Sequence, residues 1–160
     1  MEIRRAANDE HAVIGELTVE AYAAFTTGAE DFYVEHLRDA AARDRDAELW
    51  VAEVEGDVVG TLTIAPEGSP WRELGRPGEG EFRMLAVAPA ARGRGVGEAL
   101  VRHALDRFRA AGNGRVVLCS LVDMDAAHRI YRRLGFVRAP ELDWSPEEGV
   151  DLIAFAKELS

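Results

Sequence analysis

The sequence predicts one α/β domain over residues 1–160, built on a mixed β-sheet with helices on both faces. Two β-rich runs at 48–54 and 58–65 are joined by a short turn, which predicts antiparallel neighbours. A strand, a helix and a strand follow one another over 81–122, which predicts a right-handed βαβ unit. A chain of 160 residues is long enough to bury a core without disulfides or metals. We therefore expect a sheet that is antiparallel early and parallel at its centre.

The first elements follow from capping and helical spacing. A short strand at 2–6 leads to Asn8 or Asp9, either of which is expected to cap a helix. Gly28 is expected to end this helix. The apolar positions at helical spacing are Val13, Leu17, Ala21 and Ala24. A second helix is predicted over 30–43, where Phe32, Leu37 and Ala40 or Ala41 share a side.

The hairpin and the loop after it come next. Glu55-Gly56-Asp57 indicates a tight turn between the runs 48–54 and 58–65. The stretch 66–80 contains three prolines and four glycines and predicts a long surface loop. Ordered loops of this length in compact domains are often functional.

The remaining elements alternate between strand and helix. We predict a strand at 81–88, a helix at 96–112 that Gly112 closes, and a buried strand at 115–122. The last elements are a helix at 125–134, a strand from Phe136 and a strand at 150–159.

The charge balance argues against one class of partner. Nineteen basic and twenty-nine acidic side chains give a net charge of −10, which disfavours a nucleic-acid binder because such proteins present a basic face. The acidic balance suits a cationic substrate, although it also serves solubility.

The chain shows no signal for membrane insertion or metal binding. Residues 1–13 lack an apolar segment, and nowhere do about eighteen apolar residues run together. We therefore expect a cytoplasmic protein without a membrane partner. Cys119 is the only cysteine and is expected to be a small core residue. His11, His36 and His103 lack metal-ligand spacing, so no metal is expected.

A glycine-rich loop at 92–97 joins the strand 81–88 to the next helix. Gly93, Gly95 and Gly97 allow a ligand to approach the backbone, and the amides at a helix start favour a phosphate group. Arg92 and Arg94 add positive charge. The alternative is a flexible connection with exposed arginines.

Two nucleotide motifs do not match this loop. The dinucleotide fingerprint requires a third glycine where the chain has Glu98. The P-loop requires a lysine, and the only lysine in the chain is Lys157.

A third motif does match. The loop 92-RGRGVG-97, after the strand 82-FRMLAV-87, resembles the first signature of the GCN5-related N-acetyltransferases, the GNAT family. The stretch 127-AHRIYRRLGF-136 resembles the second signature of that family. The resemblance implies a GNAT-like fold and acetyl-CoA as co-substrate, with the pyrophosphate on the loop and the pantetheine along a strand that splays from 115–120. The implied cofactor-binding residues are Met84, Leu85, Ala86, Val87, Arg92, Gly93, Arg94, Gly95, Val96 and Gly97.

The resemblance also implies catalytic positions. Glu81 matches the family's catalytic glutamate and is expected to act as general base, directly or through water, with Glu53 and Asp123 in reserve. Tyr131 matches the tyrosine that protonates the leaving thiolate; the alternative is a packed core residue. A backbone amide near Leu85 would stabilise the oxyanion.

One position departs from the family pattern. The family often carries asparagine where this chain has Met124, and a neighbouring aspartate is expected to cap the helix in its place. His128 and Arg129 are candidates for contact with the cofactor phosphates; the alternative is a solvated helix surface.

The acceptor is expected among the first two helices, the loop 66–80 and the segment 138–149. An acidic, aromatic mouth there would suit a cationic amine; the alternative is that the aromatic residues fill a core rim. Its expected residues are Phe25, Phe32, Tyr33, Trp71 and Trp144, with Glu30, Asp31, Glu67, Glu141 and Asp143. We expect acetyl transfer to a primary amine of a small molecule or peptide by direct attack in a ternary complex, and a homodimer is compatible with this. The alternative is a non-catalytic acyl-CoA-binding sensor.

Overall fold

The computed structural model describes residues 1–26 and 32–159, and of Phe32 the backbone alone. The helix end expected at Gly28 and the helix start expected at Glu30 fall outside these residues.

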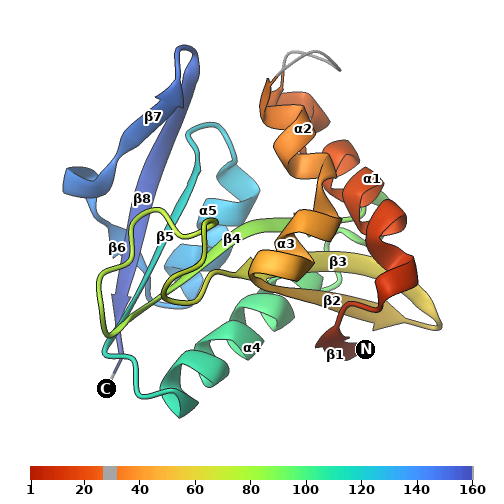
Figure 1. Cartoon of the computed structure of the whole chain (residues 1–160), viewed down its shortest axis with the longest axis horizontal. Coiled ribbons are helices and arrows are strands. Elements are labelled where there is room, and N and C mark those ends of the chain that lie inside the picture. The colour runs from red at the N-terminus through yellow and green to blue at the C-terminus, as the bar shows by residue number, and fades with distance from the viewer. Residues whose placement is uncertain (27–31, 160) are drawn as a thin grey trace.

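A mixed sheet forms the centre of the molecule (Figure 1). Its strands lie in the order β1-β2-β3-β4-β5-β8-β6, and β7 pairs with β8. The pair β4 and β5 is parallel, and the other pairs between described strands are antiparallel. This confirms the predicted fold class. The strands are β1 (Glu2–Arg5), β2 (Glu48–Val54), β3 (Asp57–Ile64), β4 (Glu79–Val87), β5 (Arg115–Leu121), β6 (Val137–Arg138), β7 (Trp144–Glu147) and β8 (Val150–Glu158).

Helices cover both faces of the sheet (Figure 1). The first face carries α1, α2 and α3, and the second carries α4, with α5 beside it. The helices are α1 (His11–Tyr22), α2 (Phe32–Arg38), α3 (Ala40–Asp46), α4 (Val96–Ala110) and α5 (Asp125–Arg133). No helix within 1–26 and 32–159 is long and apolar enough to cross a membrane.

The start of α1 differs from the prediction. Asn8 and Asp9 lie in a short 3-10 turn, and neither caps the helix. Glu10 instead accepts the backbone N–H of Ala7 at 2.8 Å. The buried face is also shifted: Ile14 and Tyr22 are buried, whereas Val13 and Ala24 are exposed.

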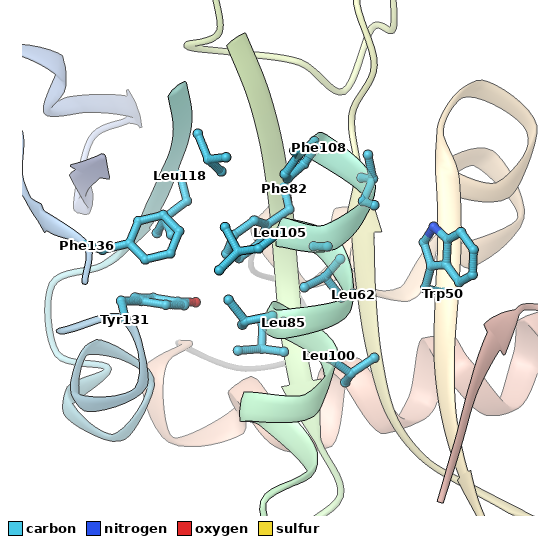
Figure 2. Close-up of a cluster of buried hydrophobic side chains, with 14 of the residues drawn as sticks. Trp50, Leu62, Phe82, Leu85, Leu100, Leu105, Phe108, Leu118, Tyr131 and Phe136 are labelled. Atoms are coloured by element: carbon cyan, nitrogen blue, oxygen red, sulfur yellow. The ribbon is translucent and has the colours of Figure 1, made fainter. Parts of the chain in front are cut away.

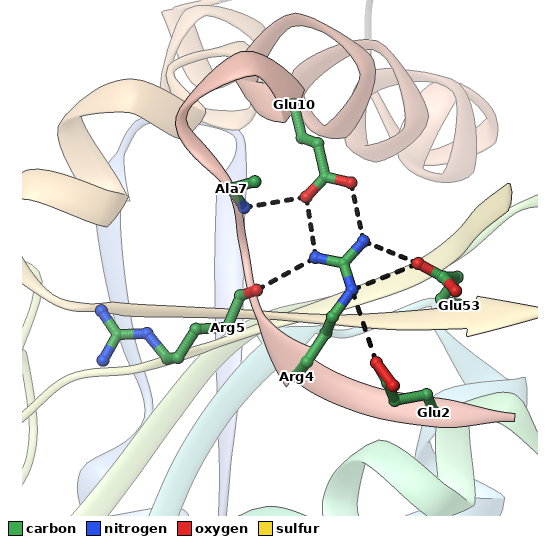
Figure 3. A network of polar contacts seen from close by, with 6 residues as sticks. All are labelled: Glu2, Arg4, Arg5, Ala7, Glu10 and Glu53. Carbon is green, nitrogen blue, oxygen red and sulfur yellow. Dashed lines mark hydrogen bonds and ion pairs between the residues drawn. The ribbon is translucent and has the colours of Figure 1, made fainter. Parts of the chain in front are cut away.

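A polar network fixes this entry to the sheet (Figure 3). The Arg4 guanidinium donates to both carboxylate oxygens of Glu10, at 2.9 and 2.8 Å, and to Glu53 at 2.9 Å. One side chain on β1 therefore ties the start of α1 to β2, through paired charge-assisted hydrogen bonds.

The predicted helix 30–43 is divided into α2 and α3. Asp39 leaves the helical conformation, with φ −80° and ψ 63°, and its carboxylate accepts the N–H of Ala42 at 3.1 Å. An aspartate that caps a new helix competes with continuation of the old one.

The strands agree with the predictions at the hairpin and differ from them at β4 and β7. The hairpin turn at Glu55 and Gly56 is confirmed, with φ of 52° and 85°. β4 begins at Glu79 rather than at Glu81, because Glu79–Glu81 pair with Arg115–Val117. Strand β7, which contains Pro146, was not predicted.

The main core lies between the sheet and α4 with α5 (Figure 2). Phe82 from β4, Leu100 from α4 and Leu118 from β5 meet there, each almost fully buried. The two parallel strands and the helix between them are therefore packed as one unit, as expected for a βαβ connection.

Candidate functional site

The sheet opens between its two parallel strands. Beyond Glu81 and Val117, no pairing between β4 and β5 continues in the described part of the chain. β5 goes on pairing with β8 as far as Leu121, and β4 goes on pairing with β3 as far as Val87. The two strands therefore diverge, each held by its other neighbour.

A bulge in β4 lies at this opening. Thr63 pairs with Arg83 and Thr61 with Ala86, so two residues of β4 stand opposite one residue of β3. Met84 has φ of 53°, which is uncommon for a residue with a side chain and marks the extra residue. The bulge shifts the alternation, so that Leu85 joins the core beside α4 while Met84 faces α1. In the described part of the chain, β5 no longer pairs with β4 at 84–87, and a strand edge without a partner is suited to pairing with an extended, amide-bearing ligand.

The glycine-rich loop ends at the first turn of α4. Gly93 and Gly95 have φ of 79° and 78°, a conformation that favours glycine, and Gly95 is the N-cap residue. The first amides of a helix have no partner within it, so the loop presents donors at the positive end of the helix dipole. Arg92 and Arg94 are exposed, and neither forms a salt bridge within 1–26 and 32–159.

Gly97 permits a close approach between α4 and α5. A Cβ at this position would stand 2.9 Å from Cδ1 of Ile130. Glycine at this position therefore keeps the start of α4 next to α5, at the edge of the opening.

An open cavity of about 390 Å³ connects the loop, the β4 edge and α5. It brings together eight of the ten predicted cofactor residues, namely Leu85, Ala86, Val87, Arg92, Gly93, Gly95, Val96 and Gly97. Met84 and Arg94 do not line it. The other walls were not among the predicted cofactor residues and include Ala21, Ala24, Phe25, Ala91, Glu98, Met124, Ala126, Ala127, Ile130 and Arg133.

The side of the cavity that α5 forms contains residues that could have been predicted from the sequence. Ala126 and Ala127 are small residues at the start of a helix whose other end supplies Tyr131, and they leave room for a ligand. Arg129 also lines the cavity. His128 is buried instead and lies 3.1 Å from Oγ of Ser120. The predicted aspartate cap is wrong, because Met124 is the N-cap residue and no side chain caps the helix.

Tyr131 points from α5 toward β4 and is buried among aromatic rings (Figure 2). Its ring centroid lies 6.0 Å from Phe82, 5.9 Å from Phe136 and 5.7 Å from Phe155. Its hydroxyl has no hydrogen-bond partner among residues 1–26 and 32–159. Burial raises the pKa of Tyr131 above its usual value, and Cys119 and Tyr33 raise it further. The hydroxyl is therefore a proton donor that holds its proton at neutral pH.

Glu81 lies beneath the long loop, fully buried. Its carboxylate accepts backbone N–H groups of Glu73 at 3.0 Å, Leu74 at 2.8 Å and Gly75 at 2.8 Å. Three consecutive residues of the loop therefore direct their backbone N–H groups at one carboxylate.

The two reserve bases lie elsewhere. Glu53 is engaged by Arg4 at 2.9 Å on the β1 side of the sheet. Asp123 is exposed in the turn after β5.

A second cavity, of about 360 Å³, is lined by residues of α2, α3, the loop after β3, β4 and β7. Tyr33 and Trp71 line it, as the sequence predicted for the acceptor mouth, whereas Phe25 lines the first cavity. Glu67 and Glu141 are exposed and line neither cavity; Glu30 and Asp31 fall outside the described residues. The charged residues of the second cavity are His36, Asp39, Arg45, Asp46, Glu73, Arg83 and Glu147.

Two of these side chains form a buried ion pair. Nε of Arg83 lies 2.8 Å from Glu73, and the two side chains are 11% and 17% exposed. The Cys119 thiol, half-buried on β5 rather than inside the core, donates to the same carboxylate at 3.6 Å. Burial raises the pKa of Cys119 to about 12. Within the described residues, no cluster of three potential metal ligands is found.

The fold and the site are those of an α/β protein whose sheet opens between two parallel strands, beside a glycine-rich helix start. The model of the acetyltransferase (GNAT) family matches residues 13–136, and the chain belongs to this family.

Relatives carry related names. The chain is 30% identical over 138 residues to a mycothiol acetyltransferase of Cellulomonas flavigena, an alignment that covers 73% of this chain and 38% of the relative. It is 37% identical over 97 residues to N-acetyltransferase 8 of Mus musculus, covering 61% of this chain and 41% of that protein. The chain thus spans roughly two fifths of the length of these relatives.

A solved structure shares the fold. A putative acetyltransferase from Salmonella typhimurium, solved with acetyl-CoA, superimposes with a TM-score of 0.68 at 23% identity. The alignment covers 100% of this chain and 94% of that one.

Proposed function

We propose that the chain transfers an acetyl group from acetyl-CoA to a primary amine of a small molecule or peptide. The observation that carries this proposal is the first cavity, which joins the Gly93–Gly97 helix start to the free edge of β4. A phosphate group fits the helix start, and an amide-bearing arm fits the strand edge. Membership of the GNAT family supports acetyl-CoA as the ligand.

The donor would lie across this cavity. The amides of 93–97, with Arg92 and Arg94, would hold the pyrophosphate. The edge at 84–87 would pair with the pantetheine, which brings the thioester to the opening between the strands. There the Leu85 amide would stabilise the oxyanion of the tetrahedral intermediate.

The acceptor would enter from the second cavity. Its four carboxylates, on Asp39, Asp46, Glu73 and Glu147, outnumber its two arginines, and Trp71 and Tyr33 offer aromatic faces. This lining favours a cationic amine through charge and cation–π attraction.

Transfer would proceed by direct attack in a ternary complex. The alternative, an acetylated cysteine, requires a thiolate, and burial holds the pKa of Cys119 at about 12. An amine with a pKa near 10.4 must lose a proton before or during attack, and the departing thiolate gains from a proton donor. We propose Tyr131 as that donor. The attacking amine also needs a base, for which the sequence predicts Glu81. A cytoplasmic location and a homodimer stay predictions.

The experiment is release of the CoA thiol from acetyl-CoA, followed with putrescine, phenethylamine, glycinamide and a peptide with a free N-terminus. We expect amine-dependent release, and acetylated product by mass spectrometry. CoA binding by calorimetry without release on any amine would support the alternative, a non-catalytic acyl-CoA sensor. A structure with CoA in which the pyrophosphate lies away from residues 93–97 would contradict the donor site.

A further inference from the structure

Glu73 occupies a position that no sequence motif indicated. It lies in the loop between β3 and β4, and its carboxylate lines the second cavity with only 17% of the side chain exposed. Arg83, from the strand at the opening, pairs with it at 2.8 Å. Arg83 and Cys119 both contact its Oε1, and a carboxylate has further acceptor sites with which it can bind a ligand in the cavity.

The same carboxylate reaches the opening of the sheet. Its Oε1 accepts the thiol of Cys119, which lies on β5 two residues beyond Val117, the last partner of β4. Tyr131 belongs to the core on the α4 side of the sheet, together with Leu118, whereas Cys119 packs against the core on the α1 side. Glu73 and Tyr131 therefore approach the opening from opposite faces of the sheet.

Glu81 is placed differently. Its carboxylate is fully buried and accepts four contacts from three amides, one of which is the N–H of Glu73 itself. Glu81 thus holds the backbone of the residue that faces the cavity, while its own oxygens are occupied.

We propose that Glu73 is the general base of the acetyl transfer and that Glu81 is a positioning residue that fixes Glu73 through the loop. This rests on the proposed function. A Glu73 carboxylate oxygen takes the proton as the amine nitrogen forms its bond to the thioester carbon. The C–S bond then breaks, the electron pair leaves on sulfur, and the Tyr131 hydroxyl supplies the proton to the thiolate. Glu73 then loses its proton to solvent and Tyr131 regains one from solvent, so that one proton has moved from nitrogen to sulfur overall.

The electrostatic surroundings agree with this role. Burial raises the pKa of Glu73, Arg83 opposes the rise, and Glu81 adds to it. A base whose pKa approaches the working pH is more effective than an ordinary carboxylate. The other charged or titratable groups around it are Cys119 on β5 and, along the cavity, Tyr33, His36, Asp39, Arg45, Asp46 and Glu147.

The test compares Glu73→Gln with Glu81→Gln, by measuring kcat against pH at saturating acetyl-CoA and the best amine of the panel. We expect Glu73→Gln to lower kcat by about 10²- to 10⁴-fold and to abolish the acid limb of the profile. Glu81→Gln should lower kcat less and keep the limb, moved to lower pH because the charge of Glu81 raises the pKa of Glu73. The opposite pattern, with the limb lost in Glu81→Gln and kept in Glu73→Gln, would overturn the proposal.

Two further measurements separate chemistry from folding. Hydroxylamine, an amine largely unprotonated at neutral pH, needs less help from a base, so the defect of Glu73→Gln should shrink with it; an equal defect with every amine would indicate a structural role and contradict the proposal. If Glu73→Gln does not fold, Arg83→Met and Glu73→Asp replace it. Arg83→Met should move the acid limb to higher pH, because Arg83 lowers the pKa of Glu73; an unmoved limb contradicts the proposal.

Controls separate this proposal from the proposed function. Glu158→Gln makes the same chemical change on a side chain that is 79% exposed at the end of β8, and its kcat should equal that of the wild type. Turnover by the wild type together with full activity of Glu73→Gln would refute the role of Glu73 alone. No turnover by the wild type on any amine would refute the proposed function, and the role of Glu73 with it.

Discussion

The hydroxyl of Tyr22, on α1, donates a hydrogen bond to the backbone carbonyl of Leu85, on β4, at 3.1 Å. Tyr22 is 6% exposed, and Leu85 follows directly after the bulge residue Met84. The first helix therefore holds the strand at the point where the sheet opens.

Replacing Tyr22 with phenylalanine should loosen this point. The variant loses one buried hydrogen bond, which typically contributes about 1 kcal/mol to the free energy of unfolding. We also expect a higher KM for acetyl-CoA, because the backbone at 84–87 is less well fixed. Denaturant unfolding and steady-state kinetics measure the two effects. Wild-type values for both would show that the bond does not support the bulge.

A methyl group at Gly95 should weaken CoA binding. An alanine in the left-handed conformation costs roughly 1–2 kcal/mol, and its Cβ would stand where a phosphate approaches the helix start. Gly112, at the other end of α4, has φ of 81° and, like Gly95, open space at the Cβ position. Gly112→Ala should therefore lose similar stability while the Kd for CoA, measured by calorimetry, stays unchanged. Equal Kd values for the two variants would place the phosphate elsewhere.

Tyr131→Phe should lose turnover but little stability. The hydroxyl makes no hydrogen bond with residues 1–26 or 32–159, so the ring packing with Phe82 and Phe155 is retained. Loss of a general acid lowers kcat by about 10²- to 10⁴-fold. Because the pKa of Tyr131 is raised, the wild type should show no alkaline loss of rate from this group until the pH exceeds 10, its ordinary value. Normal turnover of the variant at every pH would rule out the role.

The network at Arg4 predicts that part of the free energy of unfolding is lost at acidic pH. Hydrogen bonds from Arg4, and then from the backbone of Ala7, lower the pKa of Glu10 from 4.5 to about 2. A carboxylate with a lowered pKa stabilises the fold above its unfolded pKa, and this contribution is lost as the pH falls through the folded one. The Glu10→Gln variant should thus be less stable than the wild type near neutral pH, with a difference that shrinks between 4.5 and about 2. Denaturant unfolding across this range measures it; a difference independent of pH would contradict the ion-pair origin.

The first cavity could be predicted where its features are local in sequence. Glycines at 93 and 95 adopt a backbone conformation that glycine favours, and the helix start directly after them follows from periodicity. The stretch 127–136 placed Tyr131 on a helix, because the whole spacing from Ala127 to Tyr131 lies within α5. Such features depend on residues that are neighbours in the sequence, so they do not depend on the tertiary structure.

Features that depend on distant partners could not be predicted. The residue before α1 is held by Arg4 from a strand, and neither Asn8 nor Asp9 caps the helix. The buried position at the start of α1 is Ile14 rather than Val13. The position of Glu73 depends on a loop wrapped around Glu81, eight residues later, and no periodic pattern reports such a contact. The division at Asp39 was locally readable, since aspartate is a common cap, but the alanines on both sides favoured one helix.

The opening between β4 and β5 has a consequence for the stability of the protein. Only three residue pairs join the strand β4 to the strand β5, so a ligand that fills the opening bridges two halves of the sheet. Such a ligand binds the native state and not the unfolded chain, and at a hundred times its Kd it adds about 2.7 kcal/mol to the free energy of unfolding. Under the proposed function, the free energy of unfolding would therefore rise with the concentration of acetyl-CoA, and the protein would be least stable when this molecule is scarce.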